Sequence, residues 1–227
     1  MNLDVDTLRI LSIVKDSFFP LLIAGVKFTI PVAVVSFLLG SILAMATALA
    51  RISKYKSLNL ISSFYVWIIR GTPLLVQLFI IFYGLPAAGI TMGALTAAII
   101  GFTLNVGAYN SEVIRAAILS IPKGQWEAAS SIGMTHTQSL LRVILPQAAR
   151  VSVPPLSNSF ISLVKDTSLA AAITLTEMFQ IAQQITASTY EPLVLYCEAG
   201  FIYLMFCTIL STLQQKIEKK LERYVAR

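Results

Sequence analysis

Long stretches without a charged residue constrain this chain more than any other feature. The charge-free gaps are 23 positions between Lys27 and Arg51, 41 between Arg70 and Glu112, and 17 between Glu198 and Lys216. A helix crosses a hydrocarbon core with about 20 apolar residues, so the longest gap is too long for one span. The run Gly84–Gly89 contains two glycines and a proline, and it divides that gap.

The composition supports the same class of protein. Charged residues make up 12% of the chain and hydrophobic residues 56%, whereas soluble domains carry about 25% charged residues. We therefore expect an all-α membrane protein with five transmembrane helices. They are predicted at residues 18–50, 58–85, 91–118, 152–173 and 193–215.

The positions of Lys and Arg predict the orientation. Arg51, Lys54 and Lys56 follow the first helix, Lys123, Arg142 and Arg150 follow the third, and five more lie in 216–227. The segment 86–91 is uncharged and 174–192 carries only Glu177 and Glu191. Because basic loops stay in the cytoplasm, we expect the N-terminus outside and the C-terminus inside.

The same pattern divides the chain into three parts. Residues 1–17 carry three acidic residues, which argue against a cleavable signal, and apolar residues at helical spacing. They predict an external or interfacial segment. Residues 18–215 form the transmembrane domain, with a cytoplasmic loop at 119–150, and residues 216–227 form a basic cytoplasmic tail.

Several functions are excluded by residues that the chain lacks. Two Cys and one His leave little for a disulfide scaffold, a metal site or a catalytic triad, and there is no G-x-x-x-x-G-K-[ST] phosphate loop. We expect no catalytic residue, no metal and no cofactor. The basic tail is typical of a solvated helix end, so we expect no nucleic-acid partner.

The loop after the third predicted helix is the most informative segment. It predicts short helices at Gln125–Ile132 and Thr137–Val143, with Gly133 as a left-handed cap between them. Thr135 or Thr137 could cap the second helix, and Pro146 would end it. The small residues at 128 and 129 suit docking of another subunit, although a purely structural loop is an alternative.

This loop resembles the EAA motif of ABC importer permeases. The matching residues are Glu127, Ala128, Ala129, Gly133 and the run Val143-Ile-Leu-Pro146, with Val143 where that pattern usually has Ile. Arg70-Gly-Thr-Pro-Leu-Leu-Val-Gln77 and Lys165-Asp-Thr-Ser-Leu169 resemble the polar amino-acid branch, which takes histidine, glutamine, arginine or cystine. The strings Pro154–Ala170 and Leu210–Lys216 resemble L-cystine permeases most.

The resemblance implies a MetI-like, type I permease fold and a multi-pass protein of a bacterial cell membrane. It implies that Glu127, Ala128, Ala129 and Gly133 couple the chain to a dimer of ATPase subunits, which bind ATP and Mg. A second permease copy, with a homodimer favoured over a heterodimer, and an extracellular or periplasmic amino-acid-binding protein complete the expected assembly. The chain itself is then a transport subunit and no enzyme.

Polar residues inside the fourth predicted helix are candidate substrate contacts. Asn158, Ser162, Lys165 and Asp166 follow one helical stripe. An amino acid offers an ammonium for Asp166 and a carboxylate for Lys165. Alternatively, these charges pair with other helices or with a second copy, because intramembrane charges also hold bundles together.

Other helices contribute further candidates. Asn105 and Tyr109 are one turn apart on the third helix, and Gln77 follows a helix break expected at Arg70–Pro73. Glu112 and Arg115 predict a local ion pair. The small residues at 36, 40, 44 and 48 predict close helix packing.

Together these features predict a permease that moves an amino acid by alternating access, driven by ATP hydrolysis on the partner subunits. An ion-gradient-driven transporter would predict an inverted internal repeat, which the sequence does not show. A membrane regulator without transport would not need intramembrane charges at Lys165 and Asp166.

Overall fold

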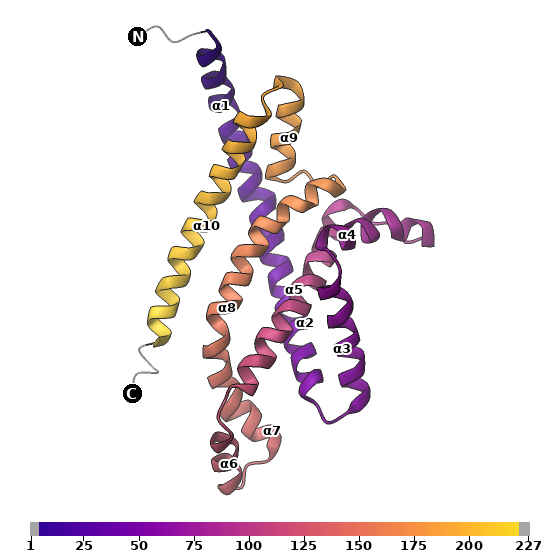
Figure 1. The fold of residues 1–227 in the computed structure, drawn as a ribbon, viewed down its shortest axis with the longest axis vertical. Helices are drawn as coiled ribbons and strands as arrows, with labels where there is room; N and C mark the ends of the chain where they lie inside the picture. The colour runs from indigo at the N-terminus through magenta and orange to yellow at the C-terminus, as the bar shows by residue number, and fades with distance from the viewer. Residues whose placement is uncertain (1–4, 223–227) are drawn as a thin grey trace. The chain divides into compact units, whose positions relative to one another are not determined.

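The structure is a computed structural model that describes the backbone of residues 5–222 and the side chains of residues 6–220. Within that range all regular elements are helical (Figure 1). The elements are α1 (Val5–Ala24), η1 (Gly25–Thr29), α2 (Ile30–Ile52), α3 (Lys56–Gly71), α4 (Leu74–Phe79), η2 (Ile80–Gly84), η3 (Leu85–Ala88), α5 (Ala94–Leu119), α6 (Lys123–Ser131), α7 (His136–Ser139), η4 (Leu140–Ile144), α8 (Leu145–Asp166), η5 (Thr167–Ile173), α9 (Met178–Thr189) and α10 (Pro192–Glu222). Elements marked η are π-helical turns (η1, η2, η4) or 3-10 helices (η3, η5).

The helices are grouped into two compact units. Unit 1 contains the described residues up to Ser36 together with 74–102 and 161–211, and unit 2 contains 37–73, 103–160 and the described residues from Thr212 on. The boundaries fall inside α2, α5, α8 and α10, and between α3 and α4.

Unit 1 has an apolar core built by α1, α9 and α10. Its buried members are Leu21, Ala24, Met178, Ala182, Ala199 and Ile202. Several of these residues are small, which lets the three helix backbones approach each other closely. The core therefore holds α9, a short amphipathic helix, against two long ones.

Unit 2 has a core that consists mostly of alanine and isoleucine. It joins α2, α5, η4 and α8 through Ala44, Ala48, Ile114, Ala117, Ile118, Ile121, Ile144 and Ala148. A Cβ added at Gly40 would lie 2.6 Å from Val106 Cγ1, which no real contact allows. The residues at 36, 40, 44 and 48 are all buried, so the predicted small-residue packing is confirmed.

The first helix is longer than the sequence predicts. Helical backbone continues from Val5 through η1 to Ile52, whereas we expected a start at residue 18. The 47 residues Asp6–Ile52 are apolar enough to count as one span, and at 1.5 Å per residue they rise about 70 Å. The predicted N-terminal segment is therefore continuous with this helix from Val5 on, and its first four residues lie outside the described range.

The second predicted helix is two helices. α3 ends at Gly71 and α4 begins at Leu74, so the predicted break at Arg70–Pro73 is confirmed and the single helix 58–85 is wrong. Proline lacks the backbone donor that would continue α3. The predicted division at Gly84–Gly89 is also confirmed, because η3 ends at Ala88, its C-cap Gly89 has φ +81°, and α5 begins at Ala94.

Pro146 does not end a helix, contrary to our expectation. Helical backbone continues from His136 through η4 and α8 to Asp166. In η4 the N–H of Leu145 donates to the carbonyl of Leu140, which makes a π-helical turn. This wider turn lies directly before Pro146 and gives its ring the room that a regular α-turn lacks. The predicted helix at 152–173 therefore begins earlier.

The sequence also misses α9, which occupies most of the external segment 174–192, predicted from its lack of Lys and Arg. Among residues 5–222, two helices are long and apolar enough to cross a membrane alone, and the bent pair of α3 with α4 to η3 would make a third. Neither α5 nor α8 is among them, because asparagines, serines and charged residues lower their hydropathy.

Candidate functional site

The segment of α6, the following turn and α7, which we call the elbow (residues 123–139), lies in unit 2 (Figure 1). Gly133 has φ +80°, and the N–H of Met134 donates to the carbonyl of Ala129 at 3.2 Å. Thr135 accepts from the N–H of Gln138, and Gln138 Oε1 accepts from the N–H of Thr135. The predicted glycine cap and Thr135 cap are confirmed, and together they define the turn.

The elbow is packed onto the core of unit 2. Trp126 lies partly buried against that core and stacks on His136 with ring centroids 4.9 Å apart. Ala129 is 3% exposed, and Gln147 donates to Gln125 Oε1 at 3.2 Å. A force on α6 would therefore reach α2, α5 and α8 through side chains in contact.

Exposure separates the four residues predicted to couple to an ATPase. Glu127, Ala128 and Gly133 are exposed, whereas Ala129 is buried. A hollow of about 460 Å³ adjoins the elbow and is lined by Trp126, Glu127 and His136 together with the end of α5. A partner could contact the three exposed positions, while Ala129 holds α6 in place.

The candidate residues of α8 share an exposed stripe. Asn158, Ser162 and Lys165 are exposed and Asp166 is half-buried, whereas Leu163 and Val164 are buried. Neither Lys165 nor Asp166 forms an ion pair within 4 Å among the described side chains.

The helix changes type at this motif. Directly after Asp166 the chain becomes the 3-10 helix η5. The hydroxyls of Thr167 and Ser168 donate to the carbonyls of Val164 and Lys165, each at 2.7 Å. These bonds satisfy carbonyls that lose their α-helical partners at the transition.

The other candidates are spread over both units. Gln77 is buried in α4 of unit 1, with Ser162, Lys165 and Asp166 in the same unit. Asn105, half-buried, and Tyr109, exposed, lie on α5 in unit 2, where Asn158 accepts from Gln214 at 3.1 Å. The seven predicted residues are therefore divided between the two units, four in unit 1 and three in unit 2.

The sequence reasoning missed a cluster of three arginines on Glu112, which we call the arginine cluster. Arg51 and Arg70 pair with Oε1 and Arg115 with Oε2, the last at 3.0 Å. Arg70 also lies over the ring of Tyr109, 5.2 Å from its centroid. The Glu112–Arg115 pair was predicted and is confirmed. The sequence holds a signal for the pairs with Arg51 and Arg70, because no Asp or Glu occurs between Asp16 and Glu112 and these arginines therefore have few acidic partners near them in the chain.

A second missed feature is a polar network in unit 1 around Glu177, which we call the Glu177 network. The fully buried carboxylate accepts from the hydroxyls of Thr29 at 3.3 Å and Tyr203 at 3.0 Å, and from the N–H of Gln180 at 2.8 Å. Glu177 lies outside the candidate spans. Burial raises the pKa of its carboxyl, and hydrogen bonds from Phe179 and Gln180 act in the opposite direction.

These features define a class of membrane protein: an all-helical bundle with an exposed elbow packed on its core. The family described as "Binding-protein-dependent transport system inner membrane component" matches residues 36–223. The chain belongs to this family and has the MetI-like fold of ABC importer permeases.

Two known permeases and one solved structure show which transport proteins the chain is similar to. The chain is 58% identical over 216 residues to the L-cystine transport system permease protein TcyB of Bacillus subtilis (strain 168), covering 95% of this chain and 92% of that protein. It is 42% identical over 207 residues to the probable amino-acid ABC transporter permease protein YckA of the same organism, covering 91% and 92%. In the crystal structure of an amino acid ABC transporter with histidines, one chain is 34% identical with TM-score 0.87, covering 97% of this chain and all of that one. The predicted resemblance is confirmed.

Proposed function

We propose that the chain is the transmembrane permease subunit of an ATP-driven importer of L-cystine. The observation that carries this proposal is its 58% identity, over nearly the full length of both proteins, to an L-cystine transport permease. Import of another polar amino acid, such as arginine, glutamine or histidine, is the alternative, because more distant relatives include an arginine permease. The substrate class is the same in both cases.

The elbow is the proposed contact with the ATPase subunits. Its exposed residues Glu127, Ala128 and Gly133 form the docking surface, and Trp126 packs against the core that joins α2, α5 and α8. Closure of the ATPase pair around Mg-ATP would displace the elbow. Since packed cores move as bodies rather than deform continuously, the helices would rock between inward-open and outward-open states.

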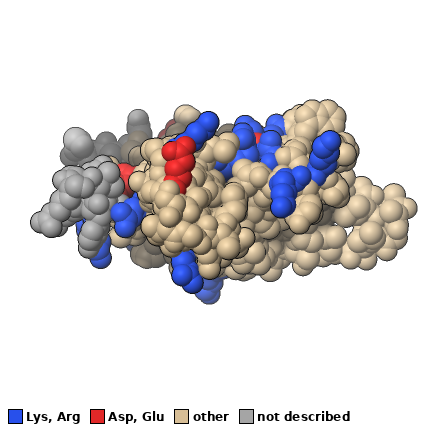
Figure 2. Space-filling view, turned by 90° about the horizontal axis from the view of Figure 1, so that it is seen from below, with Lys and Arg blue, Asp and Glu red and all other residues tan. Residues whose placement is uncertain are grey.

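Five spans with the N-terminus outside complete this proposal. In this proposal the helix from Asp6 to Ile52, the bent pair and α10, which are the candidate spans, make three crossings, and α5 and α8 are assigned as the other two. The face drawn in Figure 2 carries Lys and Arg side chains at several places and fewer Asp and Glu side chains. The basic residues Lys123, Arg142 and Arg150 around the elbow and the five in 216–227 support a cytoplasmic position for the elbow and the tail.

Asp166 and Lys165 are the proposed contacts for the two ends of the amino acid. Their side chains lack an ion-pair partner among the described residues, and a charge inside a span is costly unless something compensates it. A substrate ammonium would compensate Asp166 and a carboxylate Lys165. Ser162, Asn158, Asn105, Tyr109 and Gln77 are proposed as further contacts along the pathway.

The assembly contains more than this chain. One permease has too few spans to enclose a pathway, so we propose two copies, with a homodimer favoured over a heterodimer. Two ATPase subunits and an extracellular or periplasmic binding protein complete the importer in a bacterial cell membrane. The family description itself names a dependence on binding proteins.

Uptake by proteoliposomes tests the function. The chain is reconstituted with its ATPase and ATP is enclosed; binding protein and radiolabelled L-cystine are added outside. We expect uptake that requires ATP and binding protein, and stronger competition by unlabelled cystine than by arginine, glutamine or histidine. Uptake driven by an ion gradient without ATP would overturn the importer, and stronger competition by arginine would overturn only the substrate.

Two substitutions test the assigned residues in the same assay. Glu127→Arg should abolish substrate-stimulated ATP hydrolysis, whereas Asp6→Arg, the same change of charge in α1, should preserve it. Asp166→Asn should raise the cystine concentration for half-maximal uptake at least tenfold, and Asp16→Asn should leave it unchanged. Normal substrate-stimulated ATP hydrolysis in Glu127→Arg would rule out the coupling role of Glu127. Normal uptake by Asp166→Asn would rule out the substrate contact of Asp166.

A further inference from the structure

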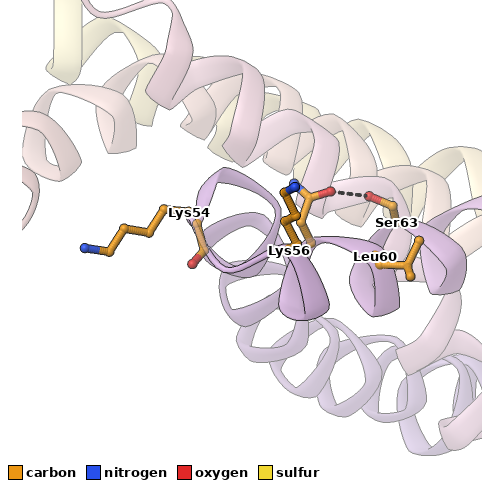
Figure 3. A pocket seen from close by; sticks show the side chains of 6 residues that line it. Lys54, Lys56, Leu60 and Ser63 are labelled. Carbon is orange, nitrogen blue, oxygen red and sulfur yellow. Dashed lines mark hydrogen bonds between the residues drawn. The ribbon is translucent and has the colours of Figure 1, made fainter.

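The turn between α2 and α3 in unit 2 contains a hollow that the proposed transport mechanism does not use. Its volume is about 430 Å³, and it is lined by Ser53, Lys54, Lys56, Asn59, Leu60 and Ser63. Lys54 and Lys56 extend on different sides of the turn, and Leu60 and Ser63 lie further along α3 (Figure 3).

Hydrogen bonds hold the hollow in shape. Asn59 donates to the carbonyl of Arg51 at 2.6 Å, which ties the first turn of α3 to the end of α2. Ser63 donates to Asn59 Oδ1 at 3.4 Å, and the N–H of Tyr55 donates to Ser53 Oγ at 3.2 Å. The polar groups of the hollow are therefore arranged before any ligand arrives.

The hollow is basic. Neither Lys54 nor Lys56 forms an ion pair within 4 Å among the described side chains, and the sequence contains no Asp or Glu from residue 17 to residue 111. Glu112 is already shared by three arginines. Lys54 Nζ lies over the ring of Tyr55, 5.9 Å from its centroid, and the uncompensated positive charge of the two lysines would attract an anionic ligand.

One face of α3 continues from the hollow as an apolar stripe. Leu60, Phe64 and Trp67 follow at i, i+4 and i+7, and they are 71%, 59% and 69% exposed. The rings of Phe64 and Trp67 stack with centroids 5.9 Å apart. The opposite face carries the buried Ser62 and Val66. A basic, hydroxyl-lined hollow thus lies at one end of an exposed apolar surface.

The geometry points to a binding site for an anionic phospholipid at the α2–α3 turn. The phosphate lies in the hollow beside Lys56, Lys54 adds positive charge from the other side of the turn, the headgroup hydroxyls face Ser53, Asn59 and Ser63, and an acyl chain follows Leu60, Phe64 and Trp67. An anionic amphiphile matches both the charge and the stripe, whereas a free anion would contact only the lysines and a neutral lipid only the apolar face.

The test uses the complete importer in lipid nanodiscs that contain phosphatidylcholine and phosphatidylglycerol. Native mass spectrometry of the released complex counts the retained lipids of each kind. We expect preferential retention of phosphatidylglycerol by the natural protein. In Lys54→Gln/Lys56→Gln the ratio of retained phosphatidylglycerol to phosphatidylcholine should fall at least tenfold, because each basic residue near an anionic lipid contributes roughly a factor of five.

Two matched variants control for charge and folding. Lys219→Gln/Lys220→Gln removes the same charge from α10 and should retain the lipid preference, and Lys54→Arg/Lys56→Arg keeps the charge at the turn and should retain it too. An unchanged ratio in the glutamine variant at the turn, or an equal loss in the α10 variant, would overturn the site.

Other occupants give different results. If the glutamine variant at the turn keeps its lipid ratio but loses the ATPase subunits or dissociates into single permeases, the turn contacts a protein and the lipid site is wrong. If inorganic phosphate alone raises the melting temperature of the natural protein in detergent as much as phosphatidylglycerol does, the ligand is a free anion. None of these measurements depends on transport. The lipid site and the proposed substrate can therefore each be overturned without affecting the other.

Discussion

The arginine cluster and the Glu177 network place a carboxylate in opposite surroundings. Glu112 is partly exposed and three guanidinium groups compensate its charge. Glu177 is fully buried, and two hydroxyls and backbone N–H groups satisfy it without any compensating charge. The arginine cluster is therefore stabilised by charge, and the Glu177 network by hydrogen bonds. Substitution of the carboxylate should change the free energy of unfolding by different amounts in the two units.

The largest effect is expected for Glu112→Gln. It leaves three guanidinium groups close together without their shared anion, and loss of one partner from such a cluster costs about 3 kcal/mol. Denaturation in detergent should show this decrease in the free energy of unfolding. The double variant Glu112→Gln/Arg115→Gln should recover part of it, and no recovery would mean that repulsion between the arginines is not the cause.

A smaller effect is expected for Glu177→Ala. Thr29, Tyr203 and the N–H of Gln180 lose their common acceptor, and buried donors left without an acceptor cost about 2 kcal/mol here. The same denaturation assay measures this loss. A change near zero would show that water or another group replaces the carboxylate.

Glu177→Gln serves as the control for charge. Because burial raises the native pKa above the ordinary 4.5, the folded state binds more protons than the unfolded state between the two values. The contribution of Glu177 to the free energy of unfolding is therefore fully present below pH 4.5, and it is lost as the pH rises through the native pKa. The stability of the natural protein relative to Glu177→Gln should fall with rising pH, and a rise would contradict this assignment.

Tyr203→Phe removes only one donor from the Glu177 network and should cost about 1 kcal/mol. Tyr196→Phe is the matched control, since Tyr196 lies on the same helix and is 41% exposed. Tyr203→Phe should unfold at a lower denaturant midpoint than Tyr196→Phe. Equal midpoints would mean that the 3.0 Å bond to Glu177 contributes nothing to stability.

The smallest effect is expected for Arg70→Gln, below about 1 kcal/mol, as for other exposed ion pairs. Arg70 is 44% exposed and 3.9 Å from Glu112 Oε1, whereas Arg115 is closer and less exposed. Arg115→Gln should therefore cost more in the same assay. The reverse order would indicate that the contact of Arg70 with Tyr109 is the stronger one.

Local features of the sequence were predicted well. The break at Gly71–Pro73, the left-handed Gly133, the Thr135 cap and the Glu112–Arg115 pair each depend on residues within a few positions of one another. Their physical causes, namely a missing donor, a missing Cβ, a side-chain cap and the helical repeat, are all present in the local sequence.

Features that join distant segments were not predicted. Arg51 and Glu112 are far apart in the chain, as are Thr29, Glu177 and Tyr203, and no periodicity relates them. The π-helical turn before Pro146 was also missed, and the structure likewise keeps Pro154 and Pro155 inside α8, because a proline in the sequence does not by itself show whether the neighbouring turns adjust.

The sequence by itself determined the class of this protein, the apolar segments and the residues that carry its family motif, because hydrophobicity, charge and turn chemistry act locally. Tertiary structure alone decided which polar side chains share a partner, which of Ala128 and Ala129 is exposed, and how the elbow reaches the core. The physical reason is that these outcomes depend on distances between helices, and such distances are set by packing rather than by any single segment.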